Sequence, residues 1–100
     1  MIKHVVMFKL KPSIADETRP DYLTRLKSEL DALEEKIPEI KYFETGINVA
    51  KSERAYDVVL ISEFESLETL EIYRLHPEHL KVVEFIKGIC NSTIAVDYAF

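Results

Sequence analysis

Two of the chain's three histidines lie three residues apart in the segment RLHPEHLKVVEF, residues 74–85. An imidazole titrates near neutral pH, so a histidine that faces a cavity can act as a general acid or base. His79 precedes Val82 by three residues and Ile86 by seven, which places it on the apolar, inward side of a helix. The alternative interpretation is a structural histidine whose ring finds its hydrogen bonds in the core.

The neighbouring positions extend this candidate site. Pro77 suits the first position of a helix, where its missing N–H would have no partner, so His76 is predicted to cap that helix and lie near any ligand. His4 lies on an apolar face of the first predicted strand and has the same two interpretations as His79.

Other kinds of site have weaker support. His76, Glu78 and His79 are plausible metal ligands, but no cysteine cluster or second acidic motif completes a site, so we expect no metal. The chain has only two glycines and no phosphate-binding loop, and we expect no cofactor. Cys90 lacks a neighbouring base and is predicted to be a buried small side chain. Asp57, Glu63 and Asp97 alternate with apolar residues and are predicted to be solvated strand ends or to bond across subunits.

Apolar periodicity predicts the elements that position these residues. Strands are expected at residues 2–10, 40–49, 55–64 and 91–100, and helices at about 18–36, 66–75 and 80–89. Pro38 is expected to end the first helix. The resulting order, β-α-β-β-α-β, is typical of a ferredoxin-like α+β fold, with a four-stranded antiparallel sheet and helices on one face.

Both faces of two predicted strands are apolar. His4, Val6 and Phe8 share one face of the first strand, whereas Val5 and Met7 share the other. Helices can cover only one face of the sheet, so a second copy of the sheet is the simplest cover for the other. The sequence therefore favours a homodimer in which two sheets face each other around an enclosed space.

Composition limits the partners. The 100 residues are expected to form one domain, residues 1–100, and the 47% hydrophobic content is ample for a core. A net charge of −5 argues against nucleic acid as a partner, and no apolar run is long enough to cross a membrane. The lone cysteine and the absence of a recognisable signal peptide predict a cytoplasmic protein.

Five segments together resemble the stress-responsive A/B barrel domain family, whose members are dimeric α+β barrels: KHVVMFKLK, IPEIKYFETGINV, SERAYDVVLISEFES, YRLHPEHLKVVEFI and VDYAF. In the plant polyketide cyclases of this family, two histidines and a tyrosine face the barrel cavity. The resemblance assigns these roles to His4, His79 and Tyr73. Leu30 and Val58 stand where those cyclases have polar pocket residues, which is a departure from the cyclase pattern.

Two hypotheses about function follow. The first is a homodimer with a mainly apolar cavity that binds or converts a small aromatic or polyketide-like molecule, as a cyclase, lyase or isomerase that needs no cofactor. Its predicted substrate-binding residues are Phe8, Leu30, Val58, Leu60 and His76. The second is a non-catalytic, stress-related structural or assembly module, whose cavity is filled by those apolar side chains.

Overall fold

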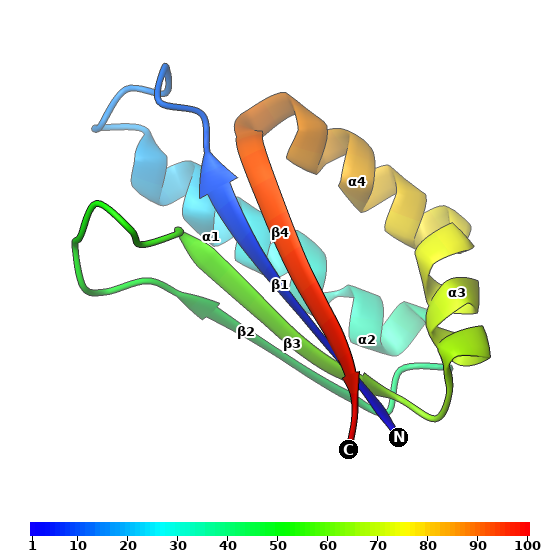
Figure 1. The fold of residues 1–100 in the computed structure, drawn as a ribbon. Helices are drawn as coiled ribbons and strands as arrows, with labels where there is room; N and C mark the ends of the chain where they lie inside the picture. The colour runs from blue at the N-terminus through cyan, green and yellow to red at the C-terminus, as the bar shows by residue number, and fades with distance from the viewer.

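The computed structural model describes residues 1–100 and confirms the ferredoxin-like plan (Figure 1). Four strands and four helical segments follow one another along the chain. They are β1 (Ile2–Leu10), α1 (Arg19–Asp31), α2 (Leu33–Lys36), β2 (Tyr42–Ile47), β3 (Val58–Phe64), α3 (Leu67–Leu75), α4 (Pro77–Ile89) and β4 (Cys90–Ala99).

The first predicted helix is present but is divided at Ala32. This residue keeps helical backbone angles, with φ −65° and ψ −20°, and its N–H donates to the Ser28 carbonyl oxygen. The interruption between α1 and α2 is therefore slight. The chain becomes extended at Ile37, just before Pro38, so the predicted end of the helix is confirmed.

The second helical region is divided at His76, as predicted. Ser66 and Thr69 form a reciprocal capping box at the start of α3, which satisfies two N–H groups that the helix itself cannot bond. At the start of α4, the His76 ring nitrogen Nδ1 accepts a hydrogen bond from the Glu78 N–H at 3.1 Å. The predicted cap is confirmed, although α4 begins at Pro77 rather than near Leu80.

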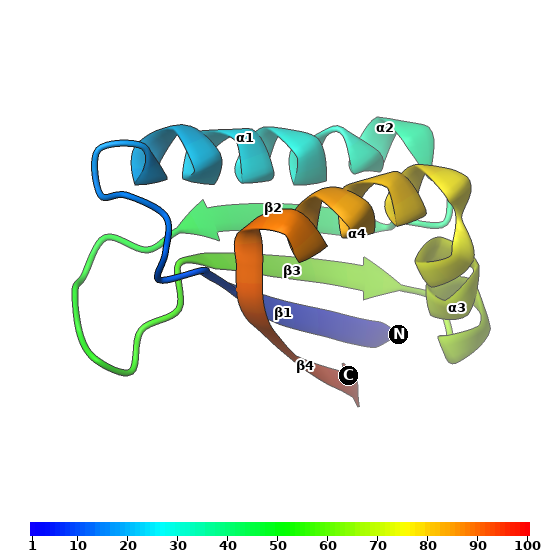
Figure 2. The ribbon, with the colours of Figure 1, turned by 90° about the horizontal axis from the view of Figure 1, so that it is seen from above.

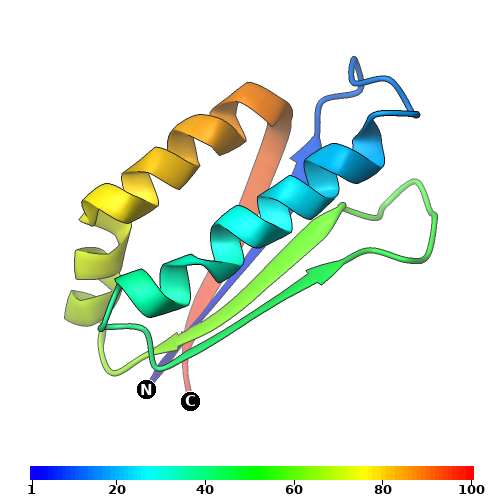
Figure 3. The ribbon, with the colours of Figure 1, turned by 180° about the vertical axis from the view of Figure 1, so that it is seen from behind.

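The sheet has the strand order β2-β3-β1-β4, and every neighbouring pair is antiparallel. The helical segments lie on one side of it, with α1 and α4 over the sheet and α3 near one end (Figure 2, Figure 3). Because β1 is central, His4 has a neighbour on each side: Ser62 on β3 and Asp97 on β4. The first and last strands thus lie together, with the two termini at the same end of the sheet (Figure 1).

The helix-covered face of the sheet forms one hydrophobic core with the helices. Phe8, Leu60 and Phe64 of the strands pack there with Leu26 and Leu30 of α1, all of them buried. Burial of such side chains is the main stabilising contribution, about 1.5–3 kcal/mol for each.

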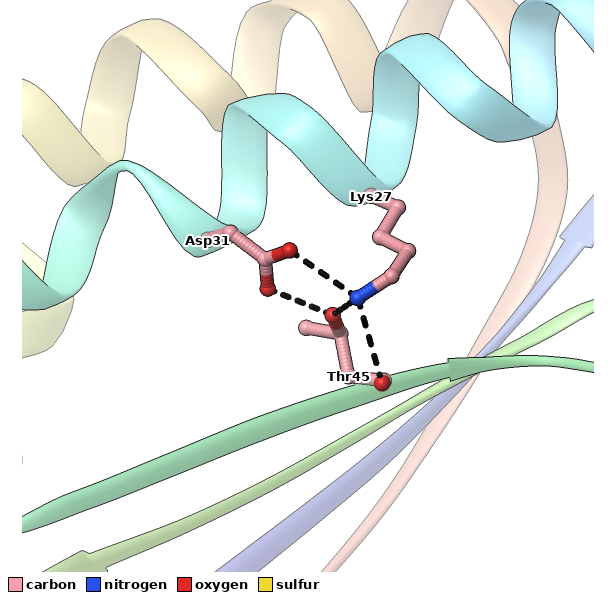
Figure 4. A network of polar contacts seen from close by, with 3 residues as sticks. All are labelled: Lys27, Asp31 and Thr45. Atoms are coloured by element: carbon pink, nitrogen blue, oxygen red, sulfur yellow. Dashed lines mark hydrogen bonds and ion pairs between the residues drawn. The ribbon is translucent and has the colours of Figure 1, made fainter.

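A polar contact fixes α1 against the edge strand β2. The Lys27 ammonium lies 2.9 Å from a carboxylate oxygen of Asp31 and 2.7 Å from the Thr45 hydroxyl, which itself donates to Asp31 (Figure 4). This arrangement lies at the rim of the core and holds the helix in register with the strand.

The opposite face of the sheet has no helix over it (Figure 2). Met7, Ile94 and Val96 are 40%, 47% and 62% exposed there. This is the second apolar face that the sequence predicts. No helix of the chain is both long and apolar enough to cross a membrane.

Candidate functional site

A pocket of about 410 Å³ lies on the helix-covered side of the sheet, between α4 and strands β1 and β4. The sequence instead predicts an enclosed space between the facing sheets of two subunits. That space would be on the opposite side of the sheet from this pocket. Nine of the 17 lining residues are hydrophobic, among them Phe8, Leu30 and Leu60. Volume and lining are within the range of small-molecule sites.

His4 and Asp97 form a pair at one end of the pocket. The His4 side chain projects from β1 and bonds through Nδ1 to the carboxylate of Asp97 on β4. A carboxylate only accepts, so Nδ1 carries the hydrogen and the neutral ring keeps its free lone pair at Nε2. The pair also forms an ion pair when the imidazole is protonated.

His79 is the second imidazole in the pocket. Its Nδ1 lies 2.9 Å from the backbone carbonyl oxygen of Arg74, one turn earlier at the end of α3. A carbonyl oxygen accepts, so here too the hydrogen is on Nδ1 and the lone pair is on Nε2. Burial lowers the pKa of His79 below its ordinary value, and the bond to Arg74 opposes that effect. The ring is therefore a neutral potential base at pH 7.

The Tyr73 ring lies near both histidine rings. Its ring centroid is 4.5 Å from that of His79 and 6.2 Å from that of His4. The side chain is 1% exposed, and its hydroxyl is the one buried side-chain polar atom of the chain without a hydrogen-bond partner. An unpaired buried hydroxyl costs about 1–3 kcal/mol, so it is a feature that requires an explanation. Burial raises the pKa of Tyr73 well above its ordinary value, so the hydroxyl stays protonated and able to donate.

The structure brings most of the predicted residues together. His4, Tyr73 and His79 line the pocket with Phe8, Leu30 and Leu60. The two others lie outside its lining: Val58 is buried in the core at 2% exposure, and the His76 ring is bonded to the start of α4. The pocket remains open despite the apolar residues that the second hypothesis expects to fill it.

Asp97 is the residue that sequence reasoning misplaced. It was predicted to lie at a solvated strand end or to bond across subunits, but it bonds to His4 within the chain. Asp57 and Glu63 also have partners in the chain, because Asp57 accepts from the Leu10 N–H at 2.8 Å and Glu63 pairs with Lys3 at 3.6 Å. Register is the signal that could have found Asp97, since antiparallel pairing of the two terminal strands sets it opposite His4.

The side chains give less support to a cysteine nucleophile and to a metal site. Burial and the nearby Asp57 raise the pKa of the Cys90 thiol to about 11, so the thiol is protonated and a poor nucleophile at neutral pH. No three side chains among His, Cys, Asp and Glu are grouped so that they could hold a metal ion.

Comparison with known proteins adds to this geometry. The model of the family "Stress responsive A/B Barrel Domain" matches residues 2–100. A stress-response A/B barrel domain-containing protein of Arabidopsis thaliana is 35% identical over 98% of this chain, and the chain spans 36% of that protein's length. Olivetolic acid cyclase of Cannabis sativa is 23% identical over 97% of this chain and 94% of its own. A dimeric ferredoxin-like protein of unknown function from Bacteroides fragilis has a TM-score of 0.89 and 31% identity, covering 99% of this chain and 95% of that one.

Proposed function

Because the chain belongs to the stress-responsive A/B barrel domain family, we propose that it is a homodimer that binds a small organic carbonyl compound and catalyses proton transfer on it without a cofactor. The observation that carries this proposal is the buried Tyr73 hydroxyl, which lacks a partner in the chain and belongs to a side chain whose ring lies near those of His79 and His4. A carbonyl oxygen of a bound ligand would accept the hydrogen bond that the hydroxyl cannot make otherwise.

The proposed reaction assigns a role to each polar side chain. His79, neutral because burial lowers its pKa, removes a proton from the carbon next to the carbonyl through Nε2. Tyr73 donates a hydrogen bond to the oxygen, where negative charge develops as the enolate forms. In a cyclisation the enolate carbon attacks a second carbonyl of the same molecule, and the new alkoxide recovers the proton from His79. In an isomerisation the proton returns to a different carbon.

His4 has a supporting role in this scheme. Asp97 holds the His4 ring by Nδ1, so that when the ring is protonated its Nε2–H can orient a second carbonyl group or donate a proton to it. The similarity to olivetolic acid cyclase supports this class of chemistry, because that relative's name describes a cyclisation. Phe8, Leu30 and Leu60 would contact the apolar or aromatic body of the ligand.

The open face of the sheet supports the dimer. Exposed apolar residues on β1 and β4 would be covered by the same face of a second subunit, as in a two-fold symmetric interface. The structurally similar Bacteroides protein is dimeric. We place this dimer in the cytoplasm, in keeping with a single, buried, unpaired cysteine.

Deuterium exchange tests the proposed proton transfer. An aryl methyl ketone such as acetophenone is incubated with the protein in D₂O at neutral pH, and loss of its methyl proton signal is followed by NMR. We expect the protein to accelerate exchange and His79→Gln to slow the accelerated rate by about 10²–10⁴-fold. His76→Asn is the matched control, because asparagine also caps helices and His76 does not line the pocket. No acceleration and no ketone binding by the wild-type protein would favour the structural module instead.

A further inference from the structure

The polar lining of the pocket is divided into two separate groups. His4, Tyr73, His79 and Asp97 occupy one end, as described above, together with Arg74 near the end of α3. A second group follows the junction of α4 with β4: Lys87 on the last turn of the helix, then Asn91 and Thr93 on the strand. The proposed reaction uses nothing from this second group.

The distance between the two groups follows from the elements that carry them. His79 and Lys87 are eight residues apart on α4, which corresponds to about 12 Å at 1.5 Å per residue. Asp97 and Thr93 are four residues apart on β4, which corresponds to about 13 Å. The chain reverses where α4 runs directly into β4. The start of α4 therefore lies opposite the end of β4, and the end of α4 lies opposite the start of β4 (Figure 1).

The wall between the two groups is apolar. Val83 and Ile86 of α4 line this length with Ala95 of β4 and Val6 of β1, which is opposite Ala95 in the sheet. The pocket is therefore a slot that is polar at both ends and apolar in the middle. A compact, uniformly apolar ligand would leave the second polar group unused.

The second group has a cation and no carboxylate in the pocket lining, whereas the first has Asp97 as well as Arg74. Lys87 is the only charged residue that lines this end, and its side chain is 70% exposed. Its ammonium lies 3.6 Å from Glu84 in a solvated ion pair of the kind that contributes little, so a ligand can compete for it. The partial negative charge at the C-terminal end of α4 would repel an anion. That repulsion is reduced because the Ile86 and Ile89 carbonyl oxygens already accept hydrogen bonds from the N–H groups of Cys90 and Lys11.

From this arrangement we propose that the substrate is an elongated carbonyl compound that carries a carboxylate about 12 Å from its reacting carbonyl. The carboxylate pairs with the Lys87 ammonium and accepts from the Asn91 amide, while the apolar chain lies along Val83 and Ile86. This assignment rests on the proposed function, because Tyr73 and His79 must bind the carbonyl end.

A pair of ligands that differ only in charge tests the assignment. The ω-acetyl derivative of nonanoic acid and its methyl ester are each titrated into the protein, and dissociation constants are measured by NMR or calorimetry. We expect the acid to bind about fivefold more tightly than the ester at low salt, and the preference to weaken as salt is added.

The chain offers a matched control for Lys87. Lys81 is on the same helix, is 72% exposed and pairs with Glu78 three residues earlier, as Lys87 pairs with Glu84, but it does not line the pocket. We expect Lys87→Met to abolish the preference for the acid and Lys81→Met to preserve it. Equal binding of acid and ester, or an equal effect of both variants, would overturn the carboxylate site while the proton-transfer site stands. Binding of neither ligand, together with no exchange of acetophenone, would overturn both.

Discussion

Removal of the Tyr73 hydroxyl should make the ligand-free protein more stable. The oxygen is buried without a partner in the chain, and such a group costs about 1–3 kcal/mol relative to its hydrated state in the unfolded chain. Tyr73→Phe removes that cost and loses only the packing contacts of one atom, so we expect a gain of about 1 kcal/mol in the free energy of unfolding. For a domain of about 100 residues this raises the melting temperature by about 4–8 °C.

Tyr56→Phe is the matched control, since it removes the same atom from a different environment. The Tyr56 hydroxyl is bonded to the Ser92 hydroxyl at 2.9 Å, and a hydrogen bond of this kind contributes about 0.5–1.5 kcal/mol. We therefore expect Tyr56→Phe to lower the melting temperature. Both variants and the wild type are compared by circular dichroism at one subunit concentration, because the stability of a dimer depends on concentration.

The opposite signs of the two effects provide the test. A Tyr73→Phe protein that is less stable than the wild type would mean that the hydroxyl already has a partner, such as a bound water. It would then no longer be available for a ligand, and the reasoning that leads from this atom to a carbonyl compound would fail. A Tyr73→Phe protein that is more stable yet no longer binds ketones would show a function maintained at the expense of stability.

Four further outcomes are expected. Burial lowers the pKa of His79, so below about pH 6.5 the unfolded chain binds more protons than the folded one. Urea denaturation at several pH values should therefore show the free energy of unfolding falling as pH decreases below that point, and falling less steeply in His79→Gln. Asp97→Ala leaves the Nδ1–H of His4 without its partner and should cost about 1.5–3 kcal/mol in urea denaturation, with mixed tautomers in the nitrogen NMR spectrum of that ring. Val96→Lys places a charge on the open sheet face and should yield monomers in light scattering, whereas an unchanged dimer would refute the interface. Ser66→Ala removes the capping box of α3 and should lower the urea midpoint by the equivalent of about 1 kcal/mol.

Most of the fold could be predicted because local and periodic signals agree with it. Pro38 and the His76–Pro77 pair mark helix boundaries through the fixed geometry of proline, and both boundaries are where the sequence predicts them. Both apolar faces of β1 follow from the alternation of side chains along a strand. The break at Ala32 could not be predicted, because alanine favours helix and the deviation there is small.

The candidate site was predictable only in part, because it depends on pairing between distant segments. His79 could be placed from helical spacing, and Tyr73, which is close to it in sequence, from the resemblance to the family. Asp97 is 93 residues from His4, and nothing local distinguishes it from a solvated carboxylate. Similarly, Val58 is buried on the inward face of β3, but it lies beyond the lining of the pocket, whose extent only the packing of α4 determines.

The length of β4, an edge strand of the sheet, is more constrained than its composition, because its alternate residues face opposite sides of the sheet. Ala95 and Asp97 face the pocket, whereas Ile94 and Val96 face the open side of the sheet. Substitutions on either side can therefore be tolerated one at a time. A deletion of one residue before Asp97 would instead turn every later side chain to the opposite face, placing the Asp97 carboxylate on the open face, where the proposed second subunit would pack, and the Tyr98 ring beside His4. β4 should thus vary in composition among functional variants but hardly at all in length.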